Sequence, residues 1–545
     1  MLRSLSSALR ALREVVANPD IRRAQLAWML GYAADWAWLV ALFVYAFGVG
    51  GVASVGLIGV VRTIPAAVLA PVMSTLTDRL PRHRVLLGIY AGRAALVGLA
   101  AAAVAGGLPA WVVFVLAPVD GLLAVMHRPT YMALLPSLAR SPEELVASNA
   151  ASATMEGIGT LIGPAVGGAL VAVASPAVTF GIPAGIFVAA AGAVVAIRPA
   201  QRLRTTIAGR NGWSRLLGGL AALGQQRHAA LILAMFGAQI LVRGILNVLL
   251  VAASVQLLGL AEQGVGLLNA AIGAGGLIGA LAAMTLVTRP RLAPFMALGL
   301  VLWGTPILVI GLVPVAAVAV AVLVVLGAGN AVLDVSGFSL LQRTVPNAVR
   351  GQVFGVLEAL VMLGLGAGSA LAPLLVAAFG VGGALVATGL LLPAVAIVSW
   401  PGVRRADSRA VIPARELELL RRVPMFRLLP LTVLEQVADA AVEERFAAGS
   451  LLIVQGATGD SFYILADGAA RVSVDGRPVR EFAPGDWFGE IALLRDVPRT
   501  ASITAESDGS AFVISREAFL CAVTGDRQSL AAANAVITER TAVAS

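Results

Sequence analysis

The feature that most constrains this sequence is a succession of apolar runs, each about twenty residues long, between residues 24 and 400. A helix of about twenty residues crosses the hydrocarbon core of a bilayer. Hydrophobic residues make up 59% of the 545 positions and charged residues 13%, whereas soluble domains have about 45–50% and about 25%. The sequence therefore predicts a helical membrane protein. The twelve predicted spans are residues 24–47, 53–76, 84–105, 109–134, 149–173, 177–197, 228–257, 264–287, 292–312, 315–341, 351–378 and 381–400.

The connections between these spans differ in charge. Arginine gathers in every second connection, as around residues 79–84 and 198–210, whereas the alternate connections carry almost no charge. Because positively charged loops stay in the cytoplasm, this pattern predicts that both termini are cytoplasmic. The net charge of +9 is carried by arginine, because the sequence contains no lysine. Membrane topology accounts for this charge, which therefore does not predict nucleic-acid binding. The single cysteine, Cys521, excludes an intramolecular disulfide.

An arginine-rich stretch after residue 197 divides the spans into two sets of six, and Glu156 and Glu358 fall at matching points of the two sets. Paired halves are typical of transporters whose site lies between the halves near the middle of the membrane. We therefore predict the following domains: a basic amphipathic helix on the cytoplasmic membrane face at 1–22 (or else a frayed tail), a first transporter half at 23–198, a central cytoplasmic loop at 199–227, a second half at 228–400, a linker at 401–415 and a C-terminal domain at 416–545.

Two motifs give the membrane part a resemblance to a known family. The segment Ser74–Arg84 contains an acidic and basic loop motif between spans two and three, and Gly159–Gly168 contains a glycine-rich motif in span five. Residues 20–400 thus resemble the major facilitator superfamily, and in particular its drug-antiporter and enterobactin-exporter-like branch. The resemblance implies a conformational latch at Asp78, Arg79 and Arg82. It also implies close helix packing at Gly159, Gly163, Pro164, Gly167 and Gly168.

Several ionisable residues fall inside the predicted spans, where each costs about 2.5–3.5 kcal/mol on insertion scales and so calls for a function or a partner. A carboxylate at the cavity could exchange a proton during transport, whereas the structural alternative is ion pairing, for example of Asp35 with Arg62 or Arg93. We expect His127 and Arg128 to lie near lipid headgroups. The transport and coupling candidates are Asp35, Arg62, Arg93, Asp120, Glu156, Arg243, Asp334 and Glu358.

The stretch from Pro484 to Ser502 has the composition of a nucleotide site. Gly489 permits a tight turn, and the helical turn after it would present backbone N–H groups to an anion. Arg499 brings a planar cation that suits a phosphate, and Glu490 a carboxylate that accepts from a sugar hydroxyl. A phosphate beside a ribose describes a small nucleotide.

This stretch resembles the phosphate-binding cassette of cyclic nucleotide-binding domains, and the resemblance extends over residues 420–519. It implies a jelly-roll β-barrel with accompanying helices, in an α+β domain. It also implies that Glu490 binds the ribose 2′-hydroxyl and that Arg499 binds the cyclic phosphate. The alternative is a barrel that kept its shape and lost its ligand. The implied ligand contacts are Gly489, Glu490, Ile491, Ala492, Arg499 and Thr500.

Together these features predict a secondary transporter, not an enzyme, in the plasma or inner membrane of a bacterial cell. Its cargo would be a small amphipathic molecule or a lipid. Export would be driven by protons or by another ion or substrate gradient. The regulator would be cAMP or cGMP, with cAMP favoured. We find no Walker loop, metal-ligand spacing or Ser/His/Asp order, so we expect no metal or cofactor. The alternatives are a non-transporting sensor and a cyclic-nucleotide-gated channel, although the chain has no Thr-Val-Gly-Tyr-Gly filter.

Overall fold

The fold is described from a computed structural model. The described residues form two compact units, which divide between residues 410 and 411 and are treated separately below. The expected helix at 1–22 lies outside the described residues except for its last six positions. The described residues are 17–77, 80–139, 142–197, 212–283, 286, 289, 291–345, 347–409, 414–427, 429, 431–524, 529, 532–536 and 538.

The first unit is helical. Among the described residues, ten helices are long and apolar enough to cross a membrane, and a shorter helix, α7, occupies part of the predicted central loop. The helices are α2 (Pro19–Thr77), α3 (Arg82–Ala105), α4 (Trp111–Leu134), α5 (Pro142–Val173), α6 (Pro176–Val195), α7 (Gly212–Gln225), α8 (Arg227–Ala252), α9 (Gly264–Ala283), α10 (Ala293–Leu312), α11 (Ala316–Thr344) and α12 (Asn347–Arg409), with a 3-10 turn at Leu135–Ser137 and a π turn at Ala253–Leu257.

Two of these helices are bent at glycines and are long enough to cross a bilayer twice. In α2 the helical geometry breaks at Gly50 and Gly51, and Gly51 has a φ of 61°. In α12 it breaks at Gly380, whose φ is 68°. Glycine adopts such left-handed angles at little cost. The breaks lie in the gaps between the predicted spans 24–47 and 53–76 and between 351–378 and 381–400. The count of twelve spans stays a prediction.

The end of α12 differs from the predicted boundary at residue 400. The helix continues through Pro401 to Arg409, because its last turns have partners in the second half. Val403 and Ala406 are buried. The Asp407 carboxylate accepts hydrogen bonds from the backbone N–H groups of Leu292 (3.1 Å) and Ala293 (3.2 Å) at the start of α10. The first part of the predicted linker is therefore helix.

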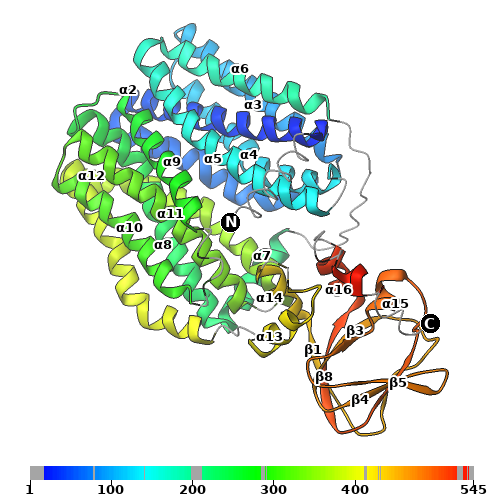
Figure 1. Cartoon of the computed structure of the whole chain (residues 1–545). Helices are drawn as coiled ribbons and strands as arrows, with labels where there is room; N and C mark the ends of the chain where they lie inside the picture. Colours follow the sequence, from blue (N-terminus) through cyan, green and yellow to red (C-terminus); the bar gives the residue numbers. More distant parts are fainter. Residues whose placement is uncertain are drawn as a thin grey trace. The chain divides into compact units, whose positions relative to one another are not determined.

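The helices of the first unit gather in two groups. Figure 1 shows the blue-to-cyan helices together and the green-to-yellow helices together, and contacts join α2, α3, α4 and α6 in one group and α8 to α12 in the other. The groups meet where Gly168 of α5 faces Gly266 of α9: a Cβ added to Gly168 would lie 2.7 Å from the Gly266 Cα. On α5, Gly159, Gly163 and Gly167 lie against α2 in the same close manner.

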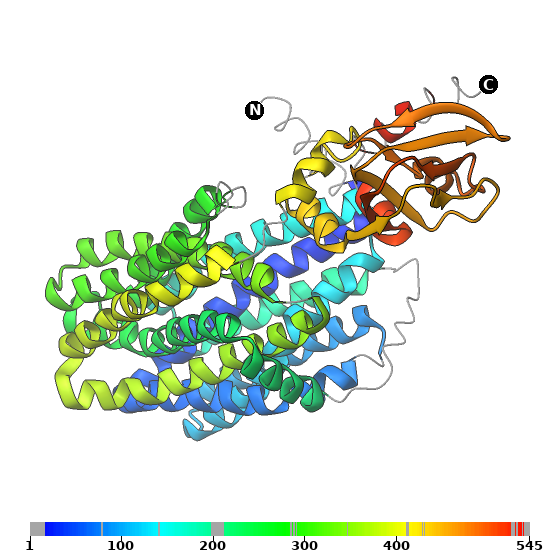
Figure 2. The same cartoon turned by 90° about the horizontal axis from the view of Figure 1, so that it is seen from below.

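The second unit is a pair of antiparallel sheets with helices that precede and follow the strands in sequence, seen in Figure 2 as the orange strands and the adjoining yellow and red helices. The strand orders are β1-β8-β3-β6 and β2-β7-β4-β5. The elements are α13 (Ala414–Arg422), α14 (Leu431–Ala440), β1 (Val442–Phe446), β2 (Leu451–Ile453), β3 (Ser461–Asp467), β4 (Ala470–Val474), β5 (Arg477–Phe482), β6 (Trp487–Phe488), α15 (Glu490–Arg495), β7 (Ser502–Ala505), β8 (Gly509–Ser515) and α16 (Arg516–Thr524).

Strand β3 shows how the sequence builds this unit. Its side chains alternate between two faces. Phe462 and Ile464 pack with the helices, where Phe462 stacks on Phe519 of α16 with ring centroids 4.6 Å apart. Tyr463 and Leu465 join the other apolar cluster, inside the barrel. One face of the strand thus packs against the helices, and its other face packs in the interior of the barrel.

The contact between Gly168 and Gly266 yields a stability prediction. A valine at 168 would force α5 and α9 apart, and overpacking of this kind costs about 1–3 kcal/mol. We expect Gly168→Val to lower the thermal unfolding midpoint of the purified chain by several degrees. Gly185→Val on α6, where an added Cβ meets no atom within 4 Å, is the matched control. Equal midpoints for the two variants would contradict the packing role of Gly168.

Candidate functional site

The cassette of the second unit is built on a left-handed glycine. Gly489 precedes α15 with a φ of 96°, and a Cβ there would lie 2.6 Å from the Arg499 Nη1 and 2.9 Å from the Ser461 carbonyl oxygen. Only glycine fits this position without displacing one of those groups. The first turn of α15, which includes Ile491 and Ala492, therefore begins directly beside the Arg499 guanidinium.

The side chain of Arg499 is buried and fixed. Its Nη1 donates to the Gly489 carbonyl (3.0 Å) and its Nη2 to the Ser461 carbonyl (2.7 Å), and Arg499 is only 6% exposed. Its backbone is held as well, because Gly456 N donates to the Arg499 carbonyl and Arg499 N donates to the Ala457 carbonyl, each at 2.8 Å. A guanidinium has five N–H groups, so the two carbonyls leave donors for an anion.

The charge of Arg499 is only partly compensated. The nearest carboxylate oxygen, that of Asp460, lies 3.8 Å away on a side chain that is 84% exposed. Burial lowers the pKa of the Arg499 guanidinium, whereas Tyr463, Asp460 and Glu490 act in the opposite direction. A buried cation whose hydrogen-bond partners are mainly neutral carbonyls favours the binding of an anion.

Groups suited to the rest of a nucleotide surround this cation. Glu490, the first residue of α15, is 1% exposed. The ring of Tyr463 stacks on Phe488 with centroids 5.1 Å apart, and the Arg499 Cζ lies 5.9 Å from the Tyr463 centroid. Thr500 is exposed. The structure thus brings a cation, a carboxylate and an apolar surface together in one region of the barrel.

In the first unit, four of the predicted candidates form one buried network. The Asp35 Oδ1 accepts from Arg62 Nη2 (2.8 Å) and from Arg93 Nη2. The Asp120 carboxylate accepts from Arg93 Nε (2.7 Å), Arg62 Nε (3.3 Å) and Trp38 Nε1 (3.1 Å). Two carboxylates therefore face two guanidiniums across α2, α3 and α4. This is the ion-pairing alternative that the sequence left open.

His127 does not lie near lipid headgroups, and the expectation from sequence is wrong for this residue. It is 5% exposed, its ring centroid lies 4.7 Å from that of Trp28, and its Nε2 lies 2.7 Å from the Tyr90 hydroxyl. Arg128 next to it pairs with Glu156 of α5 at 3.3 Å. A rule based on distance from the helix end missed the aromatic partners, because they come from α2 and α3.

The candidates of the second half are arranged differently. Asp334 of α11 accepts from Asn330 Nδ2 (2.8 Å), and Asn330 Oδ1 accepts from Trp303 Nε1 (2.9 Å). Arg243 of α8 attracts the Asp334 carboxylate electrostatically. Arg128 and Glu156 of the other half act on it more weakly and in opposite directions, and these two residues pair with each other. Glu358 of α12 is exposed.

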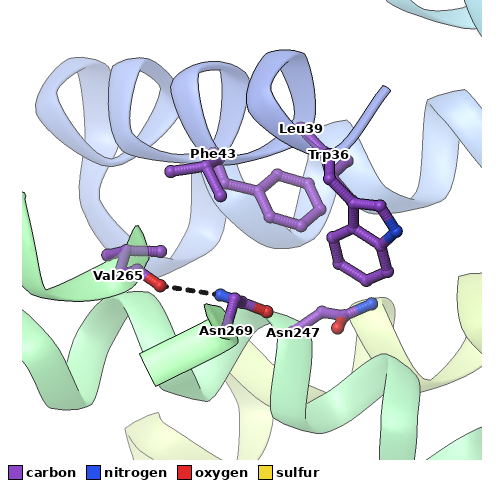
Figure 3. A pocket seen from close by; sticks show the side chains of 7 residues that line it. Trp36, Leu39, Phe43, Asn247, Val265 and Asn269 are labelled. Atoms are coloured by element: carbon purple, nitrogen blue, oxygen red, sulfur yellow. Dashed lines mark hydrogen bonds between the residues drawn. The ribbon is translucent and has the colours of Figure 1, made fainter. Parts of the chain in front are cut away.

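The sequence did not single out a pocket that lies between α2, α8 and α9. Figure 3 shows Trp36, Leu39 and Phe43 of α2 facing Asn247 of α8 and Asn269 of α9. No short motif signals such a pocket, because its walls come from segments more than two hundred residues apart. Of the predicted latch, Asp78 and Arg79 lie outside the described residues, and Arg82 is the first residue of α3.

Comparison with known proteins finds matches to both the helical part and the barrel of this chain. A model of the cyclic nucleotide-binding domain matches residues 443–524. Similar proteins include a cAMP-dependent protein kinase regulatory subunit of Aspergillus fumigatus, 40% identical over 18% of this chain and 25% of that protein. Another is a cGMP-dependent protein kinase of Toxoplasma gondii, 39% identical over 19% of this chain and 10% of that protein.

A solved structure of the regulatory domain of Toxoplasma gondii PKA with cAMP is 33% identical, over 21% of this chain and 44% of that chain, with a TM-score of 0.20. The chain thus spans about a quarter or less of the length of the two curated relatives named above. These relatives match about a fifth of this chain.

A model of the Major Facilitator Superfamily matches residues 26–291 and residues 232–464. The second match runs past the end of α12 into the barrel strands, which the nucleotide-binding match also covers from residue 443. The two matches together cover well over half of the sequence. The chain belongs to the Major Facilitator Superfamily and carries a cyclic nucleotide-binding domain after its membrane helices.

Proposed function

We propose that this chain is a secondary active transporter that exports a small amphipathic molecule or lipid and is regulated by a cytosolic cyclic nucleotide. The observation that carries the regulation is the Arg499 guanidinium, buried on two carbonyls beside Glu490. The domain that contains Arg499 and the helical membrane unit belong to one chain, so the nucleotide site is covalently attached to the carrier. Export follows the resemblance of Gly159–Gly168 to the drug antiporters.

We propose cAMP as the regulator. The kinase regulatory subunit of Aspergillus fumigatus, 40% identical in this region, is named for cAMP, whereas the Toxoplasma gondii kinase at 39% is named for cGMP. Thr500, near the position that the resemblance gives to the purine, is compatible with either ligand. The ratio of the affinities for cAMP and cGMP is therefore the quantity to measure, by titration with each nucleotide.

For proton coupling we propose Asp334. The four charges of the first half, from Asp35 to Asp120, balance one another at short distance, which suits a structural role. Asp334 instead hydrogen-bonds a neutral amide and interacts with charges of both halves. A proton on this carboxylate would change the electrostatic interaction between the halves, and so the equilibrium between their two arrangements.

The nucleotide site is tested by calorimetry on the full chain in detergent, with cAMP and with cGMP. Removing a charge-assisted contact of about 1.5–3 kcal/mol should weaken cAMP binding of Arg499→Ala by roughly 10- to 150-fold. Arg480→Ala on β5, where the side chain is 53% exposed, is the matched control and should bind like the parent chain. Undiminished affinity of Arg499→Ala for cAMP would show that the nucleotide does not bind at Arg499.

Regulation is tested without knowledge of the cargo. In a Cys521→Ser background, a cysteine at Asn247 reports access to the region between the halves through its rate of alkylation by a membrane-impermeant maleimide. Coupling of about 1–3 kcal/mol should change that rate roughly 5- to 150-fold when cAMP saturates the chain. The change should vanish in Arg499→Ala. A rate that cAMP leaves constant would reduce the chain to a sensor or an unregulated carrier.

Proton coupling is tested with the same cysteine and a methanethiosulfonate reagent at several pH values. Each rate is divided by the rate of the unfolded protein at that pH, which removes the titration of the thiol itself. We expect the corrected rate to depend on pH in the parent chain and to be flat in Asp334→Asn. Asp334→Glu, which keeps the carboxylate, should retain the dependence. An unaltered pH profile in Asp334→Asn would exclude this residue as the coupling group.

A further inference from the structure

We propose that the pocket between α2, α8 and α9 holds the polar head of the cargo, and that this head carries no net charge. The proposal rests on the proposed transport function and names its substrate class: an uncharged amphipath with both a hydrogen-bond donor and an acceptor. Figure 3 shows the walls that carry the inference. They come from both groups of helices, so a molecule in the pocket touches both halves of the carrier.

One wall of the pocket is apolar and aromatic. Trp36, Leu39 and Phe43 lie on one face of α2, because residues three and four positions apart align on a helix. Phe43 is 7% exposed, and Val265 of α9, at the opposite wall, is 1% exposed. The cavity that the walls enclose is about 10 Å³, which is room for a small polar group and not for a ring or an alkyl chain.

The other wall presents uncharged polar groups. The Asn269 Nδ2 donates to the Val265 carbonyl of its own helix at 2.9 Å, which leaves the Asn269 carbonyl oxygen as an acceptor. Neither the Trp36 indole nor the Asn247 amide has a hydrogen-bond partner among the described residues. Both side chains are half-buried, so water or a ligand in the cavity can pair with them. A ligand with a donor and an acceptor would supply both partners.

The walls of the pocket carry no charge. None of the seven lining residues is charged. Asp35, next to Trp36 in sequence, is bound by Arg62 and Arg93. A charged head would lose its hydration and find no counterion among the lining residues, whereas an amide or hydroxyl head would lose nothing that the pocket does not replace.

The test compares three octyl compounds that differ only in the charge of the head: octanamide, octanoate and octyltrimethylammonium. Binding to the full chain in lipid nanodiscs is measured by equilibrium dialysis without nucleotide, and partition into protein-free nanodiscs is subtracted. We expect octanamide to bind at least about tenfold more tightly than either ion. Tightest binding of octanoate or of octyltrimethylammonium would overturn the proposal.

Substitutions locate the binding. Trp36→Phe and Asn247→Leu should each weaken octanamide binding several-fold. Trp111→Phe and Asn149→Leu, on exposed positions of α4 and α5, are the matched controls and should leave it unchanged. Asn247→Asp keeps the shape of the side chain and adds a charge, so it should shift the preference to octyltrimethylammonium. A preference that Asn247→Asp does not shift would place the binding elsewhere.

The outcome separates this proposal from the transport function. Binding is measured with no gradient and no cAMP, so a failure to bind octanamide would remove the uncharged substrate class and leave regulated transport standing. Tight octanamide binding together with an alkylation rate that ignores cAMP would have the opposite meaning. The pocket would then stand without the proposed regulation.

Discussion

The constraint on which the structure depends is the cost of keeping an arginine away from water. The membrane unit meets it with opposite charge: Arg93 is 1% exposed and lies between the carboxylates of Asp35 and Asp120. The C-terminal unit meets it with neutral carbonyls: Arg499 is 6% exposed and donates to Gly489 and Ser461. The first arrangement is electrically complete, whereas the second retains positive charge that a phosphate can balance.

The balance of charge distinguishes the groups that hold the fold together from the groups for which we propose a function. Breaking a balanced buried pair leaves an uncompensated charge and costs about 3–5 kcal/mol, so the network around Arg93 ties α2, α3 and α4 into one body. Asp334 sits in a looser setting, bonded to the Asn330 amide and influenced by charges of both halves. A rocking carrier needs rigid bodies and a few groups whose interactions change between them. We propose that the two halves of this chain divide those tasks.

Local patterns in the sequence predicted much of this molecule. Apolar runs predicted the long helices, glycines at 50, 51 and 380 coincide with their bends, and the motif from Gly489 to Arg499 predicted a turn beside a cation. These features depend on neighbours along the chain. The partners of His127 and the pocket at Trp36 and Asn247 depend on helices far apart in sequence. A single sequence does not show which helix faces pack together, so neither the partners of His127 nor the pocket could be predicted.

The central claim is that occupation of the Arg499 site shifts the arrangement of the two halves. Its most direct test is the distance distribution between spin labels at Leu108 and Val313, which are 53% and 45% exposed and belong to different halves, in a Cys521→Ser background. We expect saturating cAMP to redistribute the population between two distances in the parent chain and to have no effect in Arg499→Ala. Identical distributions with and without cAMP, in a chain that binds it, would contradict the claim.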